Sequence, residues 1–223
     1  MRHHTIRLFL LSPVLAVVVF AQNQQTTTPT VTFNCDFPGS DPAHYGISVS
    51  SDGQASYISD GKLTRDSDSD EPFTLDFKMP HGMLAQIFDL TQKAHYFEGD
   101  IDSKRKNIAS TGEKTLAYKE GQRSTSATYN YSIVPAVQEL TALFQNLSST
   151  LEYGRRLEYD HRYQKLALDE ELKRMDEASS RGGLADVSVI ASVLKKIIED
   201  QSVVNTARAR AQRLMEHSAA GGK

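Results

Sequence analysis

The sequence predicts an α+β fold: a small antiparallel sheet with a packed helix, followed by a C-terminal antiparallel helical hairpin. Short runs between residues 31 and 131 alternate apolar and polar side chains, which is typical of strands with one buried face. Within this range, Met83, Ile87 and Leu90 recur at helical spacing after Pro80. Beyond Pro135 the apolar residues keep helical spacing almost to the end of the chain. Strands and helices in this order favour an antiparallel sheet covered by helices.

Composition excludes several classes of protein. The chain has 223 residues, 39% of them hydrophobic and 24% charged, which excludes general disorder and a collagen-like repeat. Its formal net charge of -3 lacks the basic excess of a dedicated nucleic-acid binder, so we expect no nucleic-acid partner. The single cysteine excludes a disulfide framework and a cysteine-rich zinc site.

The first 21 residues have the features of a signal peptide. Arg2 and Arg7 give a basic start, and an apolar run extends from Leu8 to Phe20. This run is shorter than the roughly 20 residues that a membrane span needs, and Ala21 ends it with a small residue. We therefore expect cleavage after Ala21, export to the periplasm or the medium, and no transmembrane span in the mature chain. Loss of both arginines would change the net charge from -3 to -5.

After a polar leader at residues 22–30, expected to be flexible, the sheet domain is predicted over residues 31–150. Its expected turns are Asp52-Gly53, a strong hairpin signal, and the segment 120–123. The expected strands lie near residues 31–37, 45–49, 55–58, 73–77, 108, 116–119 and 125–131.

The helical hairpin is predicted over residues 151–217, with a turn at Arg181-Gly182-Gly183 and a disordered tail at 218–223. Ser149 and Glu152 resemble a capping box, which indicates a helix break near residues 147–150. The second arm has heptad spacing, typical of a coiled-coil seam. Its positions are Val187, Ile190, Leu194, Ile197, Gln201, Val204, Arg208, Ala211 and Met215. We interpret four of them as an interaction surface: Ile190, Leu194, Ile197 and Val204.

Charge is distributed unevenly between the two predicted parts. Residues 22–150 carry 10 basic and 16 acidic side chains, whereas residues 151–217 carry 12 of each. A charge-rich but neutral helical segment is expected to have a solvated face.

Cys35 would be the only thiol in an oxidising compartment, where it could form an intermolecular disulfide or act as a reactive thiol. It shares strand parity with Val31 and Phe33, however, and free cysteines are among the most buried residues. We expect Cys35 to be buried.

A weak calcium site is the one metal site that the sequence suggests. Asp66, Asp68 and Asp70 alternate as calcium ligands do. An EF-hand loop requires glycine at its sixth position and glutamate at its twelfth, where this chain has Glu71 and Phe77. An exposed acidic turn between strands is the favoured interpretation, and we expect no cofactor.

Catalytic motifs are incomplete throughout. Residues 112–115 lack the first glycine of a phosphate loop. Ser59 and Lys62 have the spacing of a catalytic Ser-x-x-Lys pair, but the chain lacks the Ser-Asp-Asn and Lys-Thr-Gly motifs that accompany such a pair. The histidines form no zinc-binding pair, and no nucleophile elbow occurs. We therefore expect a protein that is not an enzyme.

Two segments resemble a group of exported bacterial proteins of unknown function. The first runs from Tyr45 through Asp52-Gly53 to Tyr57 and continues to Tyr96-Phe97; the second runs from Asp200 to Leu214. The resemblance implies export and an α+β domain with a helical tail. It supplies no active site.

Three functions follow as hypotheses. The first is a cell-envelope or periplasmic interaction protein whose hairpin mediates self-association or partner docking. The second is a small-ligand or peptide-binding module that uses an aromatic sheet face, because Tyr129 and Tyr131 share strand parity. Ordinary packing of a helix on the sheet would also explain these tyrosines. The third is a hydrolase whose site matches no motif.

Overall fold

The computed structural model describes residues 28–221 except 65, 66, 68 and 106. The signal peptide predicted over residues 1–21 and residues 22–27 of the predicted leader therefore lie outside the described residues.

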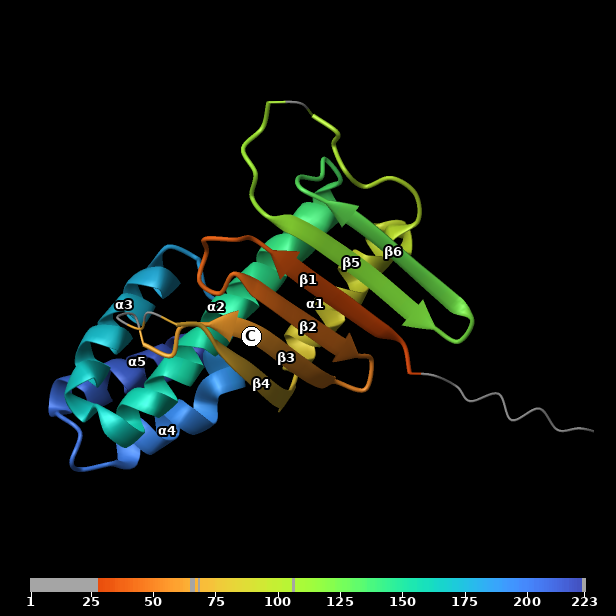
Figure 1. Ribbon diagram of the computed structural model, residues 1–223. Helices are drawn as coiled ribbons and strands as arrows, with labels where there is room; N and C mark the ends of the chain where they lie inside the picture. Colours follow the sequence, from red (N-terminus) through yellow and green to blue (C-terminus); the bar gives the residue numbers. More distant parts are fainter. Residues whose placement is uncertain (1–27, 65–66, 68, 106, 222–223) are drawn as a thin grey trace, which may run out of the picture.

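A six-stranded antiparallel sheet forms one layer of the molecule (Figure 1). The strand order is β4-β3-β2-β1-β5-β6, so β4 and β6 are the edge strands. The strands are β1 (Thr30–Asp36), β2 (His44–Ser50), β3 (Gln54–Gly61), β4 (Glu71–Lys78), β5 (Glu113–Glu120) and β6 (Arg123–Tyr129). Ile108, expected in a strand, lies in the loop before β5.

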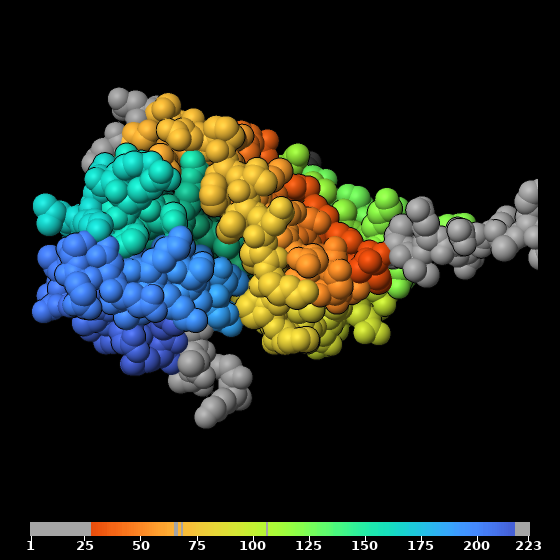
Figure 2. All heavy atoms as spheres, turned by 90° about the horizontal axis from the view of Figure 1, so that it is seen from below, coloured from red at the N-terminus to blue at the C-terminus, as the bar shows by residue number. Residues whose placement is uncertain are grey.

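Helices cover one face of this sheet and extend past its end. The α-helices are α1 (His81–Lys93), α2 (Pro135–Tyr163), α3 (Leu168–Ser180), α4 (Ala191–Glu199) and α5 (Asn205–Gly221). Short 3-10 turns are η1 (His95–Phe97), η2 (Lys165–Ala167) and η3 (Val187–Ile190). In Figure 2 the teal and blue helices α3, α4 and α5 form one end of the molecule, and the yellow and orange segments lie beside them. Among the described helices, none is long and apolar enough to cross a membrane.

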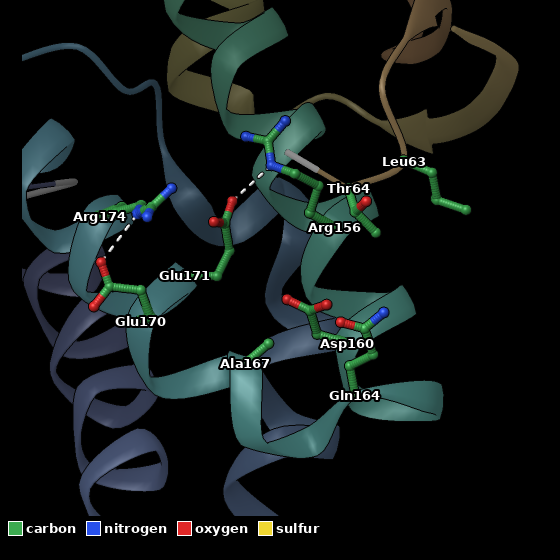
Figure 3. Close-up of a pocket in the computed structure, with 9 residues that line it drawn as sticks. All are labelled: Leu63, Thr64, Arg156, Asp160, Gln164, Ala167, Glu170, Glu171 and Arg174. Atoms are coloured by element: carbon green, nitrogen blue, oxygen red, sulfur yellow. Dashed lines mark hydrogen bonds and ion pairs between the residues drawn. The ribbon is translucent and has the colours of Figure 1, made fainter. Parts of the chain in front are cut away.

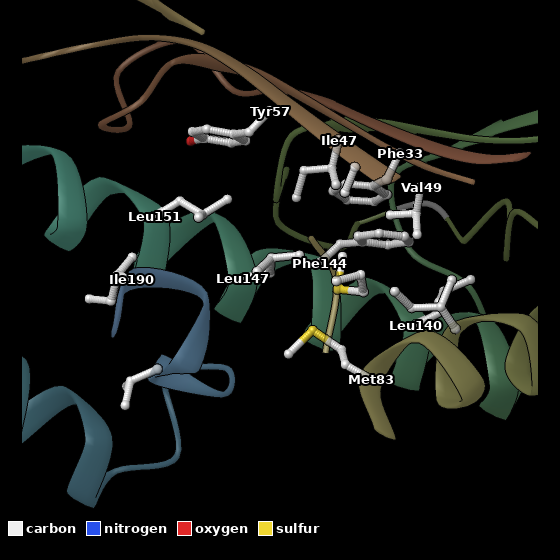
Figure 4. Close-up of a cluster of buried hydrophobic side chains, with 14 of the residues drawn as sticks. Phe33, Ile47, Val49, Tyr57, Met83, Leu140, Phe144, Leu147, Leu151 and Ile190 are labelled. Carbon is white, nitrogen blue, oxygen red and sulfur yellow. The ribbon is translucent and has the colours of Figure 1, made fainter. Parts of the chain in front are cut away.

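The alternating pattern of the strands places apolar side chains on the helix-covered face. Val31, Phe33 and Cys35 of β1 are buried, and Phe33 pairs across the sheet with Ile47 and Leu116. Helix α2 closes this core, because the ring of Phe144 stacks on Phe33 with 5.1 Å between ring centroids (Figure 4). The expected burial of Cys35 is confirmed: the thiol is free and its residue is 6% exposed.

The tyrosines proposed as a binding surface do not form an open face. Tyr129 is buried beneath the helices, and its hydroxyl is hydrogen-bonded to Thr141 of α2. Tyr131 lies beyond the end of β6 and is partly exposed. The outer face instead carries small polar residues: Thr32 lies opposite Ser48, which lies opposite Ser56.

Helix α2 is continuous over 29 residues, so the predicted helix break at residues 147–150 is wrong. The predicted domain boundary at residue 150 also falls inside this helix. Leu147 and Leu151 are fully buried, and the Thr150 hydroxyl donates a hydrogen bond to the Asn146 carbonyl one turn earlier. Tertiary packing therefore overrides the local capping signal. One helix belongs to both the sheet layer and the helical end.

The predicted final helix is divided into α4 and α5 by residues 200–204. Asp200 Oδ1 accepts hydrogen bonds from the backbone N–H (2.9 Å) and the hydroxyl (2.7 Å) of Ser202, which favours a turn over a helix. The buried stripe then moves by one position, so that Val203 and Ala207 are buried and Val204 is 44% exposed. The predicted continuous heptad seam is wrong at Gln201 and Val204, which are exposed, whereas Ala211 further along it is fully buried.

The remaining predictions for the helical part have mixed outcomes. The turn at residues 181–183 is present: Gly182 has a φ of 71°, and the Gly183 N–H donates to the Ala178 carbonyl. The predicted α+β fold class is confirmed; the hairpin-like pair is formed by α4 and α5, which both lie in the predicted second arm. Helix α5 continues to Gly221, whereas residues 218–223 were predicted to be a disordered tail.

Gly154 tests the packing between α2 and the following helices. A Cβ atom at this position would lie 2.5 Å from Cγ2 of Ile190, so Gly154→Ala requires the core to shift. We expect a loss of about 1–3 kcal/mol in the free energy of unfolding, measured by chemical denaturation.

Gly82→Ala in α1 is the matched control, because no atom lies within 4 Å of its added Cβ. It should leave stability unchanged or raise it by up to about 1 kcal/mol. Equal stability of Gly154→Ala and the wild type would contradict the close packing.

Candidate ligand-binding pocket

Helix α2 carries four charged side chains that the fold buries. Glu152, Arg155, Arg156 and Asp160 are between 2% and 8% exposed. Their spacing places them along one side of the helix, where α2 passes between the sheet and the C-terminal helices. Charged residues are rarely buried unless they are paired, so each one requires an electrostatic explanation.

Glu152 and Arg155 anchor α2 to the sheet. Glu152 Oε1 accepts hydrogen bonds from the hydroxyls of Tyr57 (2.9 Å) and Ser59 (2.6 Å) on β3. Arg155 donates to the carbonyls of Gly61 (3.3 Å) and Glu71 (3.0 Å). Burial, followed by the Glu152 carboxylate, raises the pKa of Tyr57, which keeps this phenol protonated as a donor. These contacts fix the position and rotation of α2.

One turn further along, Arg156 and Asp160 face a cavity of about 190 Å³ (Figure 3). Its walls come from the loop after β3, from α2, from η2 and from α3. The lining residues are Leu63, Thr64, Arg156, Asp160, Gln164, Ala167, Glu170, Glu171 and Arg174.

Both arginines of the cavity are already paired. Arg156 Nε lies 2.6 Å from Glu171 Oε1 in a buried ion pair, and Arg174 Nε lies 3.1 Å from Glu170 Oε1 (Figure 3). The lining thus contains two guanidinium groups and three carboxyl groups. Asp160 is the carboxyl group left over, and within the described part of the chain nothing donates a hydrogen bond to its side chain.

The environment of Asp160 shifts its proton equilibrium toward neutral pH. Burial and, to a smaller extent, the nearby Glu171 carboxylate raise its pKa, Arg156 opposes the shift, and the net result is a pKa of about 6. A buried carboxyl group with a strongly shifted pKa in a cavity marks a candidate functional site. It can exchange a proton near pH 6 or pair with a positively charged group.

The residues predicted as an interaction surface lie elsewhere and are mostly inaccessible. Ile190, Leu194 and Ile197 are at most 3% exposed and belong to the hydrophobic core of the chain itself. Of the four, only Val204, in the segment just before α5, is exposed. A partner cannot reach the first three while the domain is folded.

The calcium prediction receives no support. Asp66 and Asp68 lie outside the described residues, and Asp70 is exposed just before β4. Across residues 28–221, apart from the four undescribed positions, no group of three His, Cys, Asp or Glu residues could hold a metal ion.

The sequence reasoning missed Arg156, Asp160 and Glu171 because it treated the charges of this segment as a solvated helical face. The available signal was their position. Arg156 and Asp160 flank Leu157 on the apolar side of a helix, and Glu171 precedes the buried Leu172. No protein family and no curated protein matches the chain, so the assignment depends on this geometry.

Asp160→Asn tests the electrostatic cost of the pocket. The folded pKa of about 6 exceeds the unfolded value of about 3.9, so the wild type loses stability as pH rises between these values. The variant lacks this penalty. At about pH 8 its free energy of unfolding should exceed that of the wild type by up to about 3 kcal/mol, and thermal melting should show the gain shrinking toward about pH 4.5.

Asp76→Asn, on the outer face of the sheet, controls for a general effect of removing a negative charge. An Asp160→Asn protein that melts below the wild type at both pH values would show that the carboxylate stabilises the fold instead.

Proposed function

We propose that this protein is a non-enzymatic binding protein that holds a small, positively charged ligand against Asp160. The observation that carries the proposal is the Asp160 carboxyl group, which no described residue pairs, in a cavity whose two arginines are already neutralised. An ammonium or guanidinium group of a ligand would supply the missing partner and offset the cost of the buried charge.

The size of the cavity limits the ligand. About 190 Å³ is below the roughly 300–1,000 Å³ typical of sites for drug-sized ligands, so the ligand has few heavy atoms. Gln164 and Thr64 on the wall add neutral polar groups that can hydrogen-bond to such a ligand.

Binding of propylammonium tests the charge preference, with propanol and propionate as neutral and anionic analogues. We expect propylammonium to bind most tightly in an NMR titration. Asp160→Asn should weaken that binding about tenfold or more, because it removes a buried charge partner. Protonation of Asp160 competes with the ligand, so affinity should fall by about tenfold from about pH 7.5 to about pH 5.

Asp76→Asn again serves as the matched control and should bind like the wild type. Tighter binding of propionate, or equal affinity of Asp160→Asn and the wild type for propylammonium, would refute the proposed ligand class.

We also propose that the protein is exported to the periplasm or the medium. The support is the basic start and the apolar run of residues 1–21. N-terminal sequencing of the protein recovered from its native compartment should begin at Gln22, and a chain that still begins at Met1 would contradict export with cleavage.

A further inference from the structure

The two edges of the sheet differ in how they are protected against pairing with another strand. The β4 edge contains Pro72 and the charged residues Glu71, Asp76 and Lys78. Proline and charge are common devices that prevent edge strands from pairing with another chain. The β6 edge has the sequence Arg-Ser-Thr-Ser-Ala-Thr-Tyr, with one charge at its start and no proline. Only β4 is therefore protected by its own residues.

The hairpin between β5 and β6 determines which backbone groups of β6 are available. Glu120 pairs with Arg123 across a two-residue turn, in which Gly121 has a φ of 55°. Such a turn closes on a hydrogen-bonded pair, so residues 123, 125, 127 and 129 bond to β5. Ser124, Ser126 and Thr128 then direct their N–H and C=O groups away from the sheet. Within the described part of the chain, β6 pairs with β5 alone.

We infer that β6 is a self-association surface at which two copies of this chain pair antiparallel about a two-fold axis through Ser126. This register places Ser124 opposite Thr128 of the second copy and Ser126 opposite itself. All three residues have outward-directed backbone groups, so the hydrogen bonds are geometrically consistent. Both sheets would then join into one continuous sheet.

The side chains of β6 suit a second copy of the same strand. On the outer face the register matches Ser and Thr hydroxyls, a favourable cross-strand pairing, and on the inner face it matches Thr125 with Ala127. The one charged residue, Arg123, lies opposite Tyr129 of the second copy, so no like charges meet. A two-fold interface requires this self-complementarity.

Neighbouring segments hold β6 in place at both ends, and no backbone hydrogen bond from another described segment reaches its outward-directed groups. Arg123 forms an ion pair with Glu98 (2.8 Å) and stacks on Tyr96 (4.1 Å from the guanidinium carbon to the ring centroid). Beyond the strand, the Ser103 N–H donates to the Tyr131 carbonyl. A strand fixed in this way loses little entropy on pairing.

Sedimentation equilibrium of the purified protein tests the inference through a substitution that should spare the monomer. Ser126→Pro removes an outward N–H without removing a bond to β5, as edge strands tolerate. We expect the wild type to approach twice the mass of one chain as its concentration rises. The variant should dimerise at least about tenfold more weakly, because the central hydrogen bonds are lost.

Ser126→Lys provides a second variant in case proline disturbs the hairpin. The two-fold axis would bring its two ammonium groups together, so it should also stay monomeric, and added salt should partly restore the dimer. Thr74→Pro on the opposite free edge is the matched control and should dimerise like the wild type.

The inference is overturned if the wild type remains a monomer into the millimolar range, which would leave the β6 edge for a peptide strand of another protein. It is equally overturned if both Ser126 variants still dimerise, or if Thr74→Pro weakens the dimer as much as they do.

Discussion

Helix α2 is the element on which the rest of the structure depends, because it packs against both the sheet and the C-terminal helices. Its first half fills the core under the sheet with Leu140, Phe144 and Leu147. Its second half passes beyond the sheet and supports α3 and η3, with Gly154 leaving room for Ile190. A helix buried on more than one side has few solvated positions for its charged residues. The buried charges of α2 follow from this constraint.

The buried charges fall into two groups with different consequences. Glu152 and Arg155 form hydrogen bonds with β3 and β4, which fix the helix against the sheet. Arg156 forms an ion pair with Glu171 of α3. Asp160, one turn further on, has no equivalent partner among the described residues, and its carboxylate also faces the charge of Glu171. The fixed position of α2 holds this unfavourable arrangement in place, and a bound cation would relieve it.

The secondary-structure elements could be predicted from the sequence, but the contacts between distant segments could not. Alternation in residues 31–35 and the Asp52-Gly53 turn predicted strands correctly because these signals are local. The heptad pattern failed at Val204 because a local turn from Asp200 to Ser202 interrupts it, and the contacts of Asp200 with Lys165 and His161, which are distant in the sequence, hold that turn in place. Burial of Asp160 and Glu171 could be inferred from their apolar neighbours, but not that the two carboxyl groups share one site. Eleven positions separate them in the chain, and only the turn between α2 and α3 brings them to one cavity.

The proposed pocket and the proposed dimer edge lie at opposite ends of the sheet, and this separation has a functional consequence. The pocket borders the loop after β3, whereas β6 is the outermost strand on the other side (Figure 1). Pairing through β6 would therefore leave both pockets open at the far ends of the joined sheet. Each dimer could then bind two ligands without either site blocking the other. Two such sites would also raise the apparent affinity for a surface that displays the ligand repeatedly, provided that its spacing matches their separation.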